Sequence, residues 1–197
     1  ACTDGTSITG TLPAAGTCTL KNSLTLNADS LLNTNASYVI DNGKTLTGTA
    51  ARLTGHTISG NAVAVTALES ALGADLSGIT ATTVTAALNS SGVNLLTASA
   101  NLGDFVVTIS GDGTVTANAS ATMPSGTGKF VVGENATLEL TAAHANNLTA
   151  DSNGTVNVTE GATTPAAVLG NITTDFSSYA CTDGTSITGT LPAAGTC

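Results

Sequence analysis

The sequence predicts an all-β protein, and within that class a β-solenoid built from coils of roughly 18 residues. Three observations favour it: short runs of β-branched and apolar residues, turn residues between these runs, and apolar positions that recur at a nearly constant spacing. Threonine supplies 38 of the 197 residues, whereas aromatic residues make up 3% and tryptophan is absent. A solenoid core suits such small side chains, because each one stacks on a similar one in the next coil.

Several segments have the alternating or continuously apolar pattern of short strands. In chain order they are 62–67, 106–110, 114–120, 130–132, 137–143 and 155–160. Clusters of Gly, Asn, Asp and Ser predict turns at 41–43, 110–113 and 152–154. Helical spacing is arguable only over 67–76, where we expect at most a short helical turn.

The predicted coil length follows from the spacing of the recurring apolar positions, if each of them marks one rung. These positions are Ile40, Ile58, Leu76 and Val93, and after a slip Val131, Leu148 and Ala166. In a solenoid, like residues lie about 4.8 Å apart in successive rungs. The alternative is a pair of tandem immunoglobulin-like β-sandwiches, because about 90 residues is close to the length of one such domain. The missing tryptophan and the short spacing of the cysteines speak against sandwiches.

The chain repeats itself at two levels. Residues 1–18 return without change as 180–197, so 1–179 is one full tandem repeat and 180–197 begins the next. Inside this repeat, Tyr38–Leu46 aligns with Phe130–Leu138 at an offset of 92 residues. The repeat therefore consists of two diverged halves of about 90 residues, approximately 1–88 and 89–179.

Composition excludes several partners. Charged residues make up 9% of the chain and the net charge is −9. The four basic residues are scattered and form no basic patch, so we expect no nucleic-acid partner. They are Lys21, Lys44, Arg52 and Lys129. No apolar run approaches the ~18 residues of a membrane span, and because Ala1 opens a repeat, any targeting segment would lie outside this sequence.

The candidates for chemistry are few. His56 and His144 lie near corresponding points of the two halves, but neither has a cysteine or carboxylate neighbour at zinc-ligand spacing. Asp41, Asp112 and Asp151 have the context of turn residues and would give at most a weak surface calcium site. The acidic residues are spread singly, and no nucleophile motif is present. We therefore expect no catalytic residue, no metal centre, no cofactor and no enzymatic activity.

Two segments resemble known repeats: VTALESALGADLSGITATTVTAAL (65–88) and ATLELTAAHANNLTADSNGTVNVTE (136–160). They are similar to the Thr/Ala/Gly-rich tandem repeats of giant bacterial surface proteins, such as adhesins and extracellular fibres. The resemblance extends over most of the chain and is one of texture. It implies an extracellular or cell-surface location and a structural or adhesive role. The calcium-binding repeat GGxGxDxUx of one branch is missing, so calcium does not carry over.

Together these features predict a structural repeat unit of a long extracellular bacterial fibre, filament or surface layer. Its partners would be identical repeats or subunits, joined end to end. One alternative is a spacer or stalk repeat of a giant adhesin whose binding domain lies elsewhere. Another is an ice- or glycan-binding β-solenoid, although ice binding would need a Thr-x-Thr pair in every rung.

The cysteines are predicted to form disulfides, since their number is even and the resemblance implies a secreted chain. Cys2 and Cys18 are separated by the same short stretch of chain as Cys181 and Cys197, and we expect each pair to be bridged. The alternative is a bridge from Cys18 of one subunit to Cys181 of another. When the halves are aligned, Cys181 falls on Leu88 and Cys18 on Ile109, which suggests that a bridge replaces an apolar contact.

Overall fold

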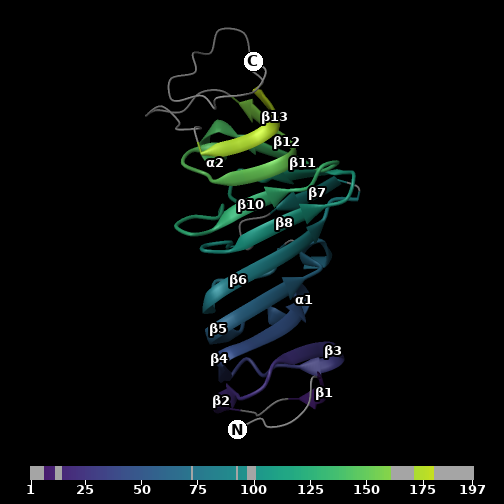
Figure 1. The fold of residues 1–197 in the computed structure, drawn as a ribbon. Coiled ribbons are helices and arrows are strands. Elements are labelled where there is room, and N and C mark those ends of the chain that lie inside the picture. The colour runs from purple at the N-terminus through teal and green to yellow at the C-terminus, as the bar shows by residue number, and fades with distance from the viewer. Residues whose placement is uncertain are drawn as a thin grey trace.

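The computed structural model describes residues 7–11, 15–71, 73–91, 93–96, 101–160 and 171–179. The chain winds into a β-solenoid with ~21 residues per turn. Figure 1 shows an elongated molecule in which the strands of successive coils lie side by side. Every pairing between described strands is parallel. The predicted β-solenoid is therefore confirmed, and the immunoglobulin-like alternative is wrong because its strands pair antiparallel.

The strands are β1 (Ser7–Thr11), β2 (Gly16–Leu20), β3 (Leu24–Leu31), β4 (Ala36–Thr49), β5 (Thr57–Thr66), β6 (Ile79–Asn89), β7 (Val93–Leu96), β8 (Val106–Ser110), β9 (Thr114–Ala117), β10 (Lys129–Val132), β11 (Thr137–Thr141), β12 (Ala150–Glu160) and β13 (Ile172–Tyr179). The helical elements are α1 (Ala50–Leu53), the 3-10 turn η1 (Leu68–Ala71) and α2 (Ala142–Ala145). The short helical turn expected within 67–76 is η1, whereas α1 and α2 were not predicted.

The coil is three-sided, and we name its faces A, B and C in the order in which the chain passes along them. Face A holds strand segments 16–20, 36–40, 57–60 and 79–81. Face B holds 24–26, 45–49, 62–66, 83–89, 106–110, 129–132, 150–152 and 172–174. Face C holds 10–11 and 30–31 near one end, then 93–96, 114–117, 137–141, 155–160 and 176–179. Face B is thus the one whose pairing continues through all these coils.

The two other faces exchange roles at β6 and β7. Face A is strand up to 79–81, and its next two coils are loops, which pair at the isolated bridge Asn101–Thr122. On face C, the strand segments 10–11 and 30–31 are followed by the helical turns α1 and η1, and strand returns at 93–96, which pairs with 114–117 of the next coil. The pairing that ends on face A is replaced by pairing on face C.

The interior of the coil is filled by rows of apolar side chains from face B. One row runs through six consecutive register partners, and all of them are buried: Val65, Ala86, Val107, Phe130, Ala150 and Ile172. The large ring of Phe130 has the smaller Val107 and Ala150 as its neighbours in the row. This alternation of size lets the coils stack at strand spacing without overpacking.

The coils are longer than predicted, because one turn takes ~21 residues. Ile58 pairs with Ile79 and not with Leu76. The register offset still varies along the chain, from its shortest value between Thr45 and Ala62 to its longest between Val106 and Lys129. The prediction was too short because each coil buries several apolar residues. Leu76 is buried in the loop before β6, so in the sequence it resembles an apolar strand residue of the next coil.

Replacing Gly60 should destabilise the fold more than replacing Gly43. Both residues have a positive φ, +103° for Gly60 and +69° for Gly43. A Cβ at position 60 would lie 2.1 Å from the Ile40 carbonyl oxygen, whereas nothing lies within 4 Å at position 43. For Gly43→Ala we expect a loss of about 1–2 kcal/mol from the backbone conformation alone, and for Gly60→Ala a larger loss. Urea unfolding measures both, and equal losses would show that β4 and β5 yield without strain.

Candidate functional site

The residues that matter for a fibre are those that join one coil to the next. Most non-local side-chain hydrogen bonds connect groups 17 to 23 residues apart, which is one coil. Arg52 Nη1 donates to the Ser30 carbonyl at 2.6 Å, and Thr116 Oγ1 donates to Glu139 Oε2 at 2.9 Å. Sequence reasoning missed these pairs, because they can be recognised only once the coil length is known.

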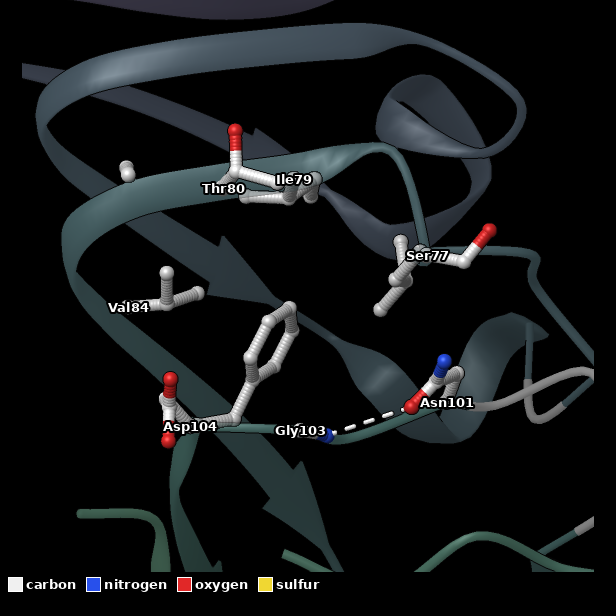
Figure 2. A pocket seen from close by; sticks show the side chains of 10 residues that line it. Ser77, Ile79, Thr80, Val84, Asn101, Gly103 and Asp104 are labelled. Carbon is white, nitrogen blue, oxygen red and sulfur yellow. Dashed lines mark hydrogen bonds between the residues drawn. The ribbon is translucent and has the colours of Figure 1, made fainter. Parts of the chain in front are cut away.

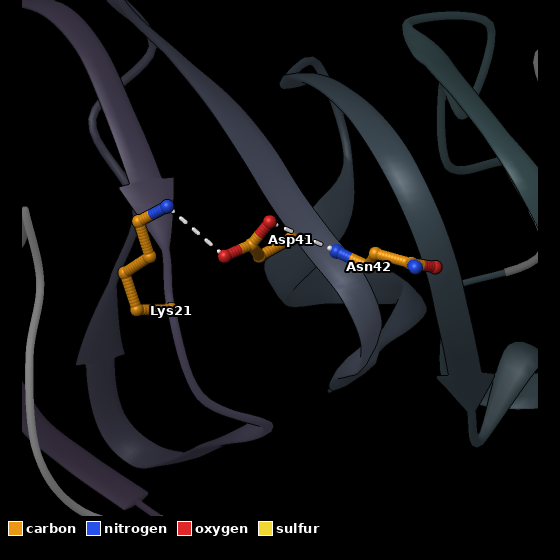
Figure 3. A network of polar contacts seen from close by, with 3 residues as sticks. All are labelled: Lys21, Asp41 and Asn42. Carbon is orange, nitrogen blue, oxygen red and sulfur yellow. Dashed lines mark hydrogen bonds and ion pairs between the residues drawn. The ribbon is translucent and has the colours of Figure 1, made fainter.

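Two ion pairs also span one coil each. Lys21 Nζ lies 3.0 Å from Asp41 Oδ2, and the Asn42 backbone N–H donates to the other carboxylate oxygen at 3.0 Å (Figure 3). Lys129 pairs with Asp151 in the same way. The hydrogen bond from Lys21, followed by that from Asn42, holds the pKa of Asp41 below its usual value. Together with Arg52, three of the four basic residues of this chain are therefore engaged between coils.

The three aspartates considered for calcium are not brought together. Asp41 and Asp151 each face a lysine in different coils, and Asp112 is exposed in the turn between β8 and β9. Within the described ranges, no group of three or more His, Cys, Asp or Glu side chains could hold a metal ion. The carboxylates instead bind ammonium groups and backbone N–H groups.

The histidines lie in different environments. His56 is buried between α1 and β5, and its Nδ1 has no hydrogen-bond partner. The Tyr38 ring packs edge-on against it, with ring centroids 6.4 Å apart. Burial lowers the pKa of His56, and the Asn33 carbonyl opposes this only in part. His144 lies on α2, where its backbone N–H donates to Thr141 Oγ1 at 3.3 Å. The structure assigns His56 to the core and His144 to a capped turn.

Of the predicted bridging cysteines, Cys18 is the one that lies in the described part of the chain. It is buried in β2, opposite Tyr38 of β4. Cys2, Cys181 and Cys197 lie outside the described residues, so both predicted disulfides remain predictions.

The positions aligned with the cysteines in the other half are Leu88 and Ile109, which are buried register partners on β6 and β8. The apolar contact that a bridge would replace is therefore present. However, the stretch from Cys2 to Cys18 is shorter than any register offset between described strands, including the shortest one, from Thr45 to Ala62.

The outward side of face B carries threonines in an irregular pattern. Successive coils present Thr45 and Thr47, then Ala62 and Ala64, then Thr83 and Thr85, then Val106 and Thr108. An ice-binding face would repeat the Thr-x-Thr pair in each rung, so this arrangement does not favour ice binding.

The comparisons with known proteins add no family. No family model, no curated protein and no solved structure matches this chain. Among the described residues, no helix has the length and apolar character to cross a membrane. The structure establishes a β-solenoid fold and identifies no family for this chain.

Removing Lys21 should raise the pKa of Asp41. Lys21 is the strongest of the groups that lower it, and Lys44 is the weakest. In Lys21→Gln, the pKa of the Asp41 carboxyl should lie closer to its ordinary value of 3.8, whereas Lys44→Gln should change it much less. Carboxyl ¹³C NMR gives both midpoints. Equal shifts in the two variants would mean that the ion pair does not persist in solution.

His56 should make the fold less stable at acidic pH. Its folded-state pKa is lowered from 6.5, so the unfolded chain takes up the proton first as the pH falls. The contribution of His56 is fully present above about pH 6.5, decreases as the pH drops below that value, and levels off below the folded-state pKa.

Urea unfolding between pH 8 and 5 measures this dependence. His56→Gln should flatten the slope in this window, whereas the matched His144→Gln should keep it. If the dependence of the unfolding free energy on pH persisted in His56→Gln, it would arise from another titrating group.

Proposed function

We propose that this chain is a structural repeat unit of a long extracellular bacterial fibre, filament or surface layer, in which identical units follow one another end to end. The observation that carries the proposal is the continuous face B, whose parallel pairing runs along the solenoid axis from 24–26 to 172–174. The exact recurrence of residues 1–18 at 180–197 supports continuation into a further unit. A solenoid grows by adding coils to a strand edge, which suits this role.

The charge distribution supports close contact between units. Only 9% of residues are charged, and Lys21 and Lys129 are neutralised by carboxylates of the next coil. Few repulsive contacts would therefore oppose stacking. We propose no catalytic reaction for this chain. We propose an extracellular location, which rests on the resemblance to giant bacterial surface proteins.

A spacer or stalk repeat of a giant adhesin is the alternative within the same architecture. The fibre and the stalk both need a stiff unit of constant length and differ in what lies beyond the repeats. The glycan-binding alternative concerns a different part of the surface.

The proposal is tested by measuring how length grows with repeat number. Proteins with one, two and three consecutive 179-residue units should appear as unbranched rods in atomic force microscopy. Each unit should add about 40 Å, because 179 residues at ~21 per turn make roughly 8.5 coils, each rising about 4.8 Å. Compact particles whose longest dimension does not increase would contradict end-to-end continuation.

Denaturing electrophoresis of the single chain, with and without reductant, tests how units are held together. A band near 19 kDa in both conditions is expected if the bridges lie within one copy. A ladder of multiples that collapses on reduction would instead favour bridges from Cys18 to Cys181 between subunits. Peptide mapping without reductant then identifies the bonded pairs.

A further inference from the structure

A gap separates two coils on face A, where strand pairing stops. It lies between the end of the face A strands at 79–81 and the loop 101–105 of the next coil, and its volume is about 240 Å³. Figure 2 shows Ile79 and Thr80 on one side of the gap, and Asn101, Gly103 and Asp104 on the other. No motif marks this site in the sequence, because its two walls come from segments that share no pattern.

The strand wall has unused backbone groups. The Ile58 N–H donates to the Gly78 carbonyl at 2.9 Å, which fixes the side on which β6 pairs with β5. Because successive residues of a strand turn their polar groups to opposite sides, the carbonyls of Ile79 and Ala81 and the N–H of Ala81 face the gap. Among the described residues, β6 pairs with the following coil only from Thr85 onward.

The loop wall directs its hydrogen bonds away from the strand. The carbonyls of Gly103 and Phe105 accept from Ser125 and Lys129 of the following coil, at 2.7 and 3.0 Å. Asp104 Oδ1 accepts from the Thr127 N–H at 3.2 Å. The strand wall and the loop wall therefore do not satisfy each other's hydrogen-bonding groups. Backbone groups on the strand side are left to bind water or a ligand.

The side chains that line the gap divide into an apolar floor and a polar rim. The floor consists of buried residues: Leu76, Ile79, Val84 and Phe105. On the rim, Asn101 Oδ1 accepts from the Gly103 N–H at 3.3 Å, so its amide NH₂ is left to donate. Asp104 uses Oδ1 for Thr127 and keeps Oδ2 as an acceptor. A donor and an acceptor are thus each held in place by one backbone N–H.

We propose that this gap binds a single pyranose ring of a saccharide. Such a ring has an apolar C–H face, which fits the floor with its aromatic Phe105. Its hydroxyl groups both donate and accept, which matches Asp104, Asn101 and the strand edge at Ala81. A volume of about 240 Å³ is below the ~300–1,000 Å³ of sites for drug-sized ligands, so it suits one ring. The proposal does not depend on the fibre role.

The site is half open and offers few polar groups, so a dissociation constant of about 1 mM is expected. The test is a ¹H–¹⁵N NMR titration of the full chain with methyl α-glucopyranoside, methyl α-mannopyranoside and methyl β-galactopyranoside, each up to about 50 mM. At least one glycoside should give saturable shifts at the amides of Thr80, Ala81 and Gly103. The tripeptide acetyl-Val-Thr-Val-amide is titrated in parallel and should give none.

Two variants locate the site. Asp104→Asn should weaken binding about tenfold, which corresponds to one hydrogen bond to a charged group. Ala81→Leu fills the gap from its edge and should abolish binding. The matched control Asp112→Asn removes an exposed carboxylate outside the gap and should bind like the wild type. Circular dichroism checks that each variant is folded.

Three results would overturn the proposal. The first is no saturable shift with any glycoside. The second is binding of the tripeptide alone, which would make the edge at 79–81 a docking site for an extended peptide. The third is unchanged glycoside binding in folded Ala81→Leu, which would place the sugar elsewhere.

Discussion

The parallel pairing along face B is the constraint on which the rest of the structure depends. Because each coil contributes one in-register strand to it, every inward residue on this face must match the residue above and below. The row from Val65 through Phe130 to Ile172 meets this requirement by alternating larger and smaller apolar groups. Faces A and C can change between strand, loop and helical turn, because the pairing on face B continues where theirs stops.

Close approach of successive backbones explains why glycine is frequent at the corners. A Cβ at Gly78 would lie 2.3 Å from the His56 carbonyl oxygen, and one at Gly154 would lie 2.0 Å from that of Gly133. Coils stacked at strand spacing leave no room for a side chain at such points. At these two positions glycine is therefore required by the stacking of the coils.

Some of the strands and corners could be predicted because their signals are local. Strands β8 and β12 have β-branched, alternating sequences, and the predicted turns at 41–43 and 152–154 are corners where register shifts within β4 and β12. Coil length could not be predicted, since buried loop residues such as Leu76 are as apolar as ladder residues. The gap near Asp104 is likewise invisible in the sequence, because it arises from a change in pairing between distant segments.

The exchange of faces has a geometric explanation in the predicted duplication. Tyr38 lies on face A, whereas Phe130, its counterpart 92 residues later, lies on face B. In the same way Leu46 lies on face B and Leu138 on face C. At ~21 residues per turn, 92 residues correspond to four coils and roughly one further face, so the second half is turned by one face relative to the first.

Among the described residues, strands on face A belong to the first half and those on face C lie mainly in the second, whereas face B carries strands in both. Strand pairing on face A stops at 79–81, close to the predicted boundary at 88 and 89, and strand pairing on face C resumes at 93–96. The gap beside Thr80 lies at this junction. Because an offset of 92 residues is not a whole number of ~21-residue coils, the last strand segment on face A has no strand of the following coil to pair with.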